Sequence, residues 1–226
     1  MTTLSSSPAR RALALAILAT AAGAVVSPSA WADGAATFCV HQSGYACPAN
    51  STDEGTALQT ALDDAAAQAA DATSPNVIVI GPGTYSGAGS GFSYPSSNPL
   101  RIEGAGASTS TLTAAPSAGT VLLLGSAGGA QTITVSGLTI TVPAQDGLGL
   151  NLTGGAADHI AVTFDAAYAT GVRLTGATLS SSSVSGVNNY AGVTTQGPHS
   201  ELDDDTVAAR EYGVLATGPT TTTGST

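Results

Sequence analysis

The chain has 226 residues, with 15 acidic and 5 basic side chains, a net charge of −10 and only 9% charged residues. So few basic residues cannot form a patch that neutralises phosphates, which argues against nucleic acid and anionic lipid as partners. Aromatic residues make up only 4% of the chain, which argues against a globular core of large side chains. A solenoid needs only a few aliphatic residues in each coil and stays compatible with this composition.

The first 32 residues have the pattern of an export signal. Arg10 and Arg11 precede an uncharged apolar run over residues 12–26, and Ala30-Trp31-Ala32 matches the small-x-small pattern that signal peptidase cleaves. The apolar run is shorter than the ~20 residues that a transmembrane helix needs. We therefore expect a signal peptide over 1–32 and a product secreted to the medium or the cell surface. General and twin-arginine export both stay open.

Two cysteines follow the predicted cleavage site, Cys39 and Cys47. In an exported chain, two cysteines this close are expected to form a disulfide that closes a small loop. The alternative is a metal pair with His41, which lies between them, but no further ligand is present to complete a closed site. The sequence therefore predicts a disulfide and no metal site.

A helix is expected within residues 53–71, and a domain of strands after it. Thr56 can act as N-cap with Gln59 three residues later, and Ser51 with Glu54 is an earlier alternative. Apolar residues recur on one face of this segment at helical spacing: Leu58, Ala61, Leu62, Ala65, Ala66 and Ala69. Strand-like runs begin at about residue 76, and no second helix separates them.

An internal repeat decides the fold class. Glycine-led segments recur at intervals of 22, 21 and 21 residues: 149–154, 171–176, 192–197 and 213–218. Alternation predicts inward columns Leu150, Val172, Val193, Val214 and Leu152, Leu174, Thr195, Ala216. A second recurring segment predicts that Ile160, Leu179 and Leu202 stack, as do Phe164, Val184 and Val207. The expected fold is all-β, a right-handed parallel β-helix with an N-terminal capping helix, over residues 33–218.

The start of this domain resembles a known family. Asp53-x-x-Thr56-Ala-Leu-Gln59-x-Ala61-Leu, followed by Val77-Ile-Val-Ile-Gly-Pro-Gly-Thr-Tyr85, is similar to the opening of pectate-lyase-like right-handed β-helix proteins. The resemblance implies that the helix caps the N-terminal end of the solenoid. It implies little about function, because lyases, hydrolases, epimerases, phage tailspikes and non-enzymatic surface proteins share this fold.

The carboxylates Asp203, Asp204 and Asp205 are the first candidates for catalysis. Paired carboxylates on this scaffold can cleave glycosidic bonds or bind calcium. They align with Ser180 to Ser183 of the previous coil, however, which predicts a solvated corner whose polar side chains bond the turning backbone. Nothing else in the sequence supports calcium, and no cofactor motif is present.

Two arginines and two histidines are weaker candidates. Arg210, in a loop, is the possible base of a lyase, and Arg173 is expected to face outward; surface ion pairing is the alternative for both. His159 and His199 have no partner at ligand spacing and are expected to be turn residues.

A recurring tyrosine precedes each of the later glycines, as Tyr168, Tyr190 and Tyr212. Filling of a corner is the expected role, and stacking on sugar rings is the alternative. Residues 219–226 are rich in Thr and Gly and are expected to be a tail or linker. Because a solenoid needs a cap at each end and the sequence offers only one, the chain is expected to be the N-terminal portion of a longer protein.

Two functions stay open at this point. The first is a secreted protein that binds or processes extracellular polysaccharide, as a lyase or glycoside hydrolase if it is an enzyme. The second is a non-enzymatic structural or adhesive cell-surface protein. Low charge and the lack of a catalytic motif favour the second, whereas export and the family resemblance favour the first.

Overall fold

The computed structural model describes residues 35–125, 132–164, 166–187 and 190–226, which belong to one compact unit, Asp33–Thr226. The predicted signal peptide lies outside the described residues. Within them, no helix is long and apolar enough to cross a membrane.

The described strands form three sheets whose pairs are all parallel. Sheet 1 has nine strands in the order β2 (Thr52–Asp53), β1 (Thr37–Val40), β3 (Asn76–Ile80), β6 (Leu100–Gly104), β9 (Ile133–Ser136), β12 (Ala156–Asp158), β15 (Thr178–Ser180), β18 (Ser200–Asp203) and β21 (Thr220–Thr223). Sheet 2 contains β4 (Gly83–Gly87), β7 (Ser110–Ala114), β10 (Thr139–Val142), β13 (Ala161–Phe164), β16 (Ser183–Gly186) and β19 (Thr206–Ala208). Sheet 3 contains β5 (Phe92–Tyr94), β8 (Thr120–Leu124), β11 (Leu148–Thr153), β14 (Thr170–Thr175), β17 (Ala191–Gln196) and β20 (Tyr212–Ala216).

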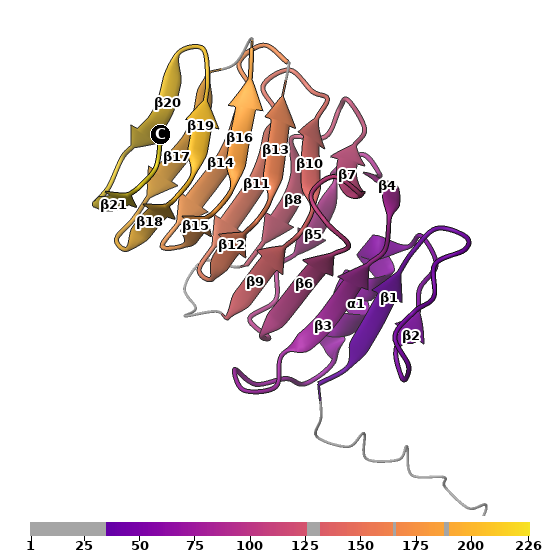
Figure 1. The fold of residues 1–226 in the computed structure, drawn as a ribbon. Coiled ribbons are helices and arrows are strands. Elements are labelled where there is room, and N and C mark those ends of the chain that lie inside the picture. The colour runs from indigo at the N-terminus through magenta and orange to yellow at the C-terminus, as the bar shows by residue number, and fades with distance from the viewer. Residues whose placement is uncertain (1–34, 126–131, 165, 188–189) are drawn as a thin grey trace, which may run out of the picture. The chain divides into compact units, whose positions relative to one another are not determined.

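From β3 onward the chain visits sheets 1, 2 and 3 in turn and then starts the next coil. Each strand pairs in parallel with its equivalents in the coils before and after it, so the coils stack as a ladder (Figure 1). Connections of a few residues leave no room for crossover helices. The predicted parallel solenoid is therefore confirmed, with three strands in each coil. We call the turn from sheet 1 to sheet 2 the first corner, and the turn from sheet 2 to sheet 3 the second corner.

The glycine-led repeat has the predicted register. Leu150 pairs with Val172, which pairs with Val193, and Val193 pairs with Val214. These segments are the sheet 3 strands β11, β14, β17 and β20. Their inward side chains are buried as far as β17, while Val214 in β20 is 40% exposed.

The predicted phasing of the second segment is right for the last two coils and wrong for the coil before them. Leu179 pairs with Leu202 and Val184 with Val207, as predicted. Toward the preceding coil, however, Leu179 pairs with Ala157, not with Ile160, and Val184 pairs with Val162, not with Phe164. The prediction took the segment for one strand, whereas residues 178–184 contain β15 and the start of β16, which belong to different sheets. A corner residue with positive φ, Ser181, separates these two strands, so alternation cannot be carried across.

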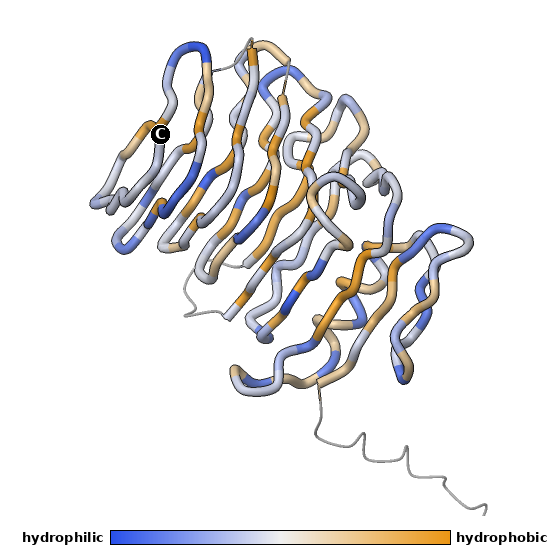
Figure 2. The backbone as a smooth tube through the Cα atoms, in the orientation of Figure 1, coloured by the Kyte–Doolittle hydropathy of each residue, from blue (hydrophilic) through white to orange (hydrophobic). Residues whose placement is uncertain are grey.

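Aliphatic side chains fill the space between the sheets. Inward and outward residues alternate along most strands, which Figure 2 shows as alternating hydrophobic and hydrophilic bands. Fully buried members include Ile78, Ile102, Leu112, Leu122, Ile140, Leu150, Val162 and Leu174. Because each coil adds only a few buried side chains, most of them aliphatic, a chain poor in aromatic residues can build this core.

The single described helix is α1 (Leu58–Ala67), shorter than the predicted segment. Its apolar face buries Leu58, Ala61, Leu62 and Ala65, and it contacts β1, β3 and β5. The predicted capping box is absent, since Ala57 is the N-cap residue and makes no side-chain cap bond. Gln59 has another role: its amide donates to Ser93 O and accepts from Ser93 N, both at 2.9 Å, which ties the helix to β5.

Two segments expected to lie outside the stacked coils are part of sheet 1. Thr37–Val40 forms β1, which pairs with β3 before the predicted start of the coils. Thr220–Thr223, expected in a tail or linker, forms β21 and pairs with β18 from Ser200↔Thr220 to Asp203↔Thr223. Composition alone does not reveal this strand, because a threonine run has no inward aliphatic residue to mark it.

Candidate functional site

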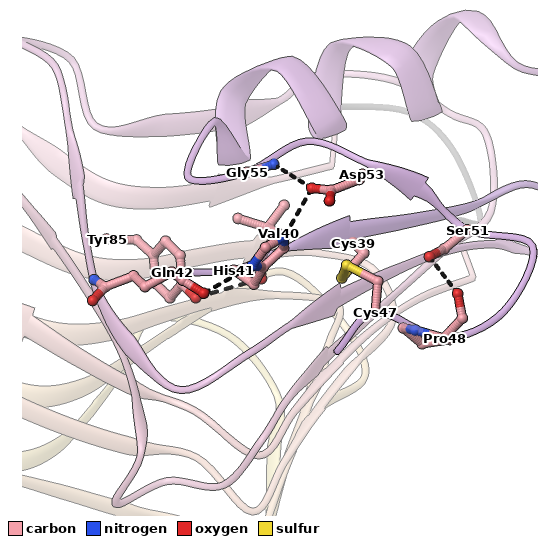
Figure 3. A network of polar contacts seen from close by, with 10 residues as sticks. All are labelled: Cys39, Val40, His41, Gln42, Cys47, Pro48, Ser51, Asp53, Gly55 and Tyr85. Atoms are coloured by element: carbon pink, nitrogen blue, oxygen red, sulfur yellow. Dashed lines mark hydrogen bonds and ion pairs between the residues drawn. A yellow bond between two sulfur atoms is a disulfide. The ribbon is translucent and has the colours of Figure 1, made fainter. Parts of the chain in front are cut away.

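The predicted disulfide is present near the N-terminal end. The Cα atoms of Cys39 in β1 and Cys47 lie 5.8 Å apart, and the sulfur atoms are bonded to each other (Figure 3). Cys39, His41 and Cys47 bring three potential ligand atoms within 4.8 Å of one another. Both sulfur atoms are committed to the disulfide, so they are not thiolate ligands. The two cysteines therefore form a structural disulfide in the oxidised protein.

His41, directly after β1, contacts β2 through one ring nitrogen and the carbonyl of the next residue through the other. Nε2 lies 2.8 Å from Asp53 Oδ1, and Nδ1 lies 2.8 Å from the carbonyl oxygen of Gln42 (Figure 3). Since both partners are acceptors, the arrangement suits the doubly protonated ring. The Gln42 carbonyl first, and Asp53 second, raise the pKa of His41, while the Gly55 amide and then His41 lower the pKa of Asp53.

We expect the contact between His41 and Asp53 to stabilise the pairing of β2 with β1 most in mildly acidic solution. The raised pKa of His41 contributes stability below its ordinary value of 6.5, and this is lost as the pH rises through the folded-state pKa. The lowered pKa of Asp53 contributes stability above 3.8, and this is lost as the pH falls through its folded-state pKa. An NMR titration should place the pKa of His41 above 6.5, and Asp53→Asn should lower it only in part because the Gln42 carbonyl stays in place. A value at or below 6.5 would contradict this pairing.

The three aspartates lie at the first corner of the last complete coil and have different environments. Asp203 ends β18 and is aligned with Ser180, as the sequence predicts. Asp204 is exposed and has a positive φ of 53°. Asp205 is 1% exposed, and burial is the main cause that raises its pKa.

Asp205 belongs to a ladder of hydrogen bonds in which backbone amides donate to side-chain oxygens. Its Oδ1 accepts from the Ser182 amide at 2.9 Å, and its Oδ2 accepts from the Asp203 amide at 3.2 Å. The ladder repeats at the same corner of adjacent coils, where the Ile160 amide donates to Ser182 Oγ and the Asp205 amide donates to Ser225 Oγ. Asp205 therefore has a structural role, and its oxygens face the backbone.

The arginine candidates lie away from these aspartates. Arg210 follows β19 at the second corner, at the opposite end of the strand from Asp204. Arg173 is in β14, between Asn151 and Thr194 of the neighbouring strands, and its Nε is buried with no hydrogen-bond partner among the described residues. The structure therefore does not bring the predicted acid and base residues together.

A shallow groove of about 660 Å³ runs along the first corner. It is lined by residues of five successive coils: Gly106, Ala107, Gly137, His159, Ile160, Ala161, Ser181, Ser182, Ser183, Asp204 and Thr206. Four steps of about 4.8 Å between adjacent coils give it a length of roughly 19 Å. The groove is open to solvent and follows the direction in which the coils stack.

The most reactive group in the groove is His159. Its Nδ1 lies 2.6 Å from Asp158 Oδ2, which fixes the orientation of the ring, and the side chain is 71% exposed. Ser180 Oγ lies 3.0 Å from Asp158 Oδ1, so this hydroxyl donates to the carboxylate and not to the imidazole. These two bonds lower the pKa of Asp158, His159 contributing more. The order serine, carboxylate, imidazole does not activate a serine nucleophile, because the serine contacts a carboxylate of lowered pKa, a weak base, and not the imidazole.

Sequence reasoning predicted His159 as a turn residue and missed its equivalence to Asp204. His159, Ser181 and Asp204 have positive φ angles of 51°, 47° and 53° and occupy the same corner position in three successive coils. Correct phasing of Ala157 with Leu179 would have revealed this column. His199, also predicted in a turn, has a φ of 64° between β17 and β18.

The recurring tyrosines do not fill the second corner. Tyr168, Tyr190 and Tyr212 are 62%, 39% and 46% exposed. The rings of Tyr190 and Tyr212 meet edge to face with centroids 5.4 Å apart. The expectation of corner packing is therefore wrong: the corner turns over small residues such as the buried Ala169 and Ala191, and the rings lie outside it.

The fold and these two corners define a parallel β-solenoid with polar and aromatic side chains displayed along its corners. No protein-family model and no curated protein sequence matches the chain. Among solved structures it is similar to ORF18 of Geobacillus virus E2, with a TM-score of 0.52 and 15% sequence identity. The match covers 77% of this chain and 39% of that protein, so the chain spans well under half the length of this neighbour. At this identity the likeness shows the fold alone.

Proposed function

We propose that this chain is a secreted solenoid that binds an extended extracellular polysaccharide in the groove of the first corner, without cleaving it. The observation that carries the proposal is the direction of the groove, which follows the stacked coils over roughly 19 Å. A linear glycan presents hydroxyls at regular intervals along one line. Three successive coils of the groove offer polar side chains in the same manner, at His159, Ser183 and Asp204.

The polar groups of the groove suit sugar hydroxyls. Asp204 supplies an acceptor, His159 supplies an imidazole oriented by Asp158, and Ser183 supplies a hydroxyl. The chain carries a net charge of −10, which disfavours an anionic polymer unless calcium bridges the two. We therefore propose a neutral polysaccharide as the ligand.

Two further observations support binding over cleavage. Asp205 is engaged with backbone amides, and Ser180 donates to Asp158, so neither is prepared for catalysis. The exposed tyrosines of the second corner are the kind of side chain on which sugar rings stack, and they supply a second contact for the same class of ligand.

The finer identity of the fold is part of the same proposal. We propose that the solenoid is right-handed and of the pectate-lyase-like type, as its opening residues suggest, and that α1 closes its N-terminal end. The packing of α1 against β1, β3 and β5 supports the capping role. The disulfide between Cys39 and Cys47 supports export, because such bonds persist in oxidising compartments.

Affinity electrophoresis tests the proposed binding. The mature protein should be retarded in gels that contain a neutral polymer from a panel of soluble β-glucan, xylan and mannan, and not by pectate or alginate without calcium. Asp204→Asn and His159→Asn should each weaken binding by about 2- to 10-fold, the value of one hydrogen bond. Asparagine is chosen because it tolerates positive φ, so the corner stays intact.

The matched control for this test is Glu201→Gln, the same chemical change in the same coil. Glu201 is exposed on sheet 1 and does not line the groove. It should bind like the wild type. Equal retardation of all three variants would contradict the assignment to the groove, and release of reducing or unsaturated ends would show that the protein is an enzyme.

A further inference from the structure

The outer face of sheet 2 carries two straight columns of small hydroxylated side chains. The register places Thr84, Thr111, Thr139, Ala161, Ser183 and Thr206 in the first column. It places Ser86, Thr113, Thr141, Thr163, Ser185 and Ala208 in the second. Every position except the two alanines carries a hydroxyl, and the residues between the columns point inward.

The two columns form a regular lattice. Neighbours within a column lie about 4.8 Å apart, one coil above the next, and the columns are about 6.6 Å apart along each strand. Buried residues such as Leu112, Ile140 and Val162 lock the strands from inside. Threonine is stiff at χ1, so its hydroxyl and methyl groups keep fixed positions. Thr141 Oγ1 and Thr163 Oγ1 lie 3.3 Å apart, so these two hydroxyls of adjacent coils are within hydrogen-bonding distance of each other.

Charge is excluded from this face of an acidic protein. Neither column contains an acidic or basic residue, whereas the outer face of sheet 1 carries Arg101, Glu103, Asp158, Glu201 and Asp203. Charges on an exposed sheet favour solubility, so a sheet face without them is suited to contact with a neutral partner. A neutral partner with its own regular lattice would match the two columns.

We infer that the outer face of sheet 2 binds ice. The repeat along each column is close to the a-axis repeat of hexagonal ice, so hydroxyls and methyls one coil apart can hold a layer of water in ice-like positions. Water held between protein polar groups is enthalpically nearly as favourable as a direct hydrogen bond. Charged side chains would orient water in ways that do not fit this lattice, which accounts for their exclusion.

The second column is the better part of this face to test. In the first column, Thr139 Oγ1 donates to the Ala107 carbonyl, and Ala161, Ser183 and Thr206 border the groove. In the second column, Thr163 is exposed at the centre and lies outside that groove. A change at Thr163 therefore separates ice binding from the proposed polysaccharide binding.

Partition into slowly growing ice tests the inference directly. The mature protein should be enriched in the ice fraction and should inhibit ice recrystallisation. Thr163→Lys should reduce both effects to the level of a protein that does not bind ice, because a long cation projects from the centre of the lattice. Thr178→Lys on sheet 1 should behave like the wild type, and circular dichroism should show both variants folded.

Each other outcome overturns the inference. Exclusion of the wild-type protein from ice would show that the protein does not bind ice. Undiminished partition of Thr163→Lys into ice would show that the outer face of sheet 2 is not the binding face. Adsorption to crystalline cellulose or chitin that is lost in Thr163→Lys, without partition into ice, would reassign this face to a solid polysaccharide. Loss of glycan binding in the groove variants leaves the ice result unchanged, so the two proposals fail separately.

Discussion

Replacing Gly171 by alanine is expected to destabilise the solenoid by about 1–3 kcal/mol, the usual cost of forcing a methyl group into a packed core. A Cβ at this position would lie 2.4 Å from Val184 Cγ1, 2.7 Å from the Gly192 carbonyl oxygen and 2.8 Å from the ring of Phe164. The clash involves backbone of the next coil, which cannot move without breaking the ladder. The glycine that leads the repeat is thus a steric requirement of stacking at Gly149, Gly171 and Gly192.

Gly213→Ala is the matched control, because it is the equivalent position of the last sheet 3 strand. A Cβ there would have only the Val207 carbonyl oxygen nearby, at 3.9 Å. Urea unfolding followed by circular dichroism should show a lower midpoint for Gly171→Ala and little change for Gly213→Ala. Equal midpoints for the two variants would contradict the stacked register.

Asp205→Ala is expected to cost about 2–4 kcal/mol, since it leaves two buried amides, those of Ser182 and Asp203, without their acceptor. The loss of stability should be concentrated in the last two coils, because the carboxylate joins the first corners of these two coils. Amide hydrogen exchange should report faster exchange of these two amides. Unchanged exchange and an unchanged unfolding midpoint would contradict the ladder.

The stability that depends on Asp205 should also vary with pH. Burial raises the pKa of this carboxyl above its ordinary value of 3.8, so the folded protein binds the proton more readily than the unfolded chain. The contribution is fully present below pH 3.8 and is lost as the pH rises through the folded-state pKa. Glu201→Gln, at an exposed position of the same coil, is the control and should leave this pH dependence in place.

The repeat in the sequence predicts sheet 3 well and the other sheets poorly. A glycine near the start of β11, β14 and β17 marks a steric requirement, so the register of Leu150, Val172 and Val193 can be read directly. The first corner has no such marker. Its corner position holds histidine, serine or aspartate in successive coils, all of which tolerate positive φ, so nothing in the sequence shows where one strand ends.

The same limit conceals the candidate site. The alignment of the aspartates with serines predicts a solvated corner whose side chains bond the backbone. Asp205 makes the predicted backbone bonds but is buried, not solvated. The groove, in contrast, exists only when residues more than twenty positions apart are superposed coil on coil, which needs the correct phase at the first corner. The exposure of Tyr168 also depends on how tightly a corner turns, which composition does not encode.

The dependence of affinity on glycan length tests the central claim most directly. With the neutral polysaccharide that retards the protein, oligomers of increasing length should bind more tightly until they span the groove, roughly 19 Å, and no more tightly beyond that length. Asp204→Asn should lower the affinity that the longest oligomers reach, and no oligomer should be shortened after long incubation. An affinity that does not depend on length, or no retention by any polymer of the panel, would contradict binding along the first corner.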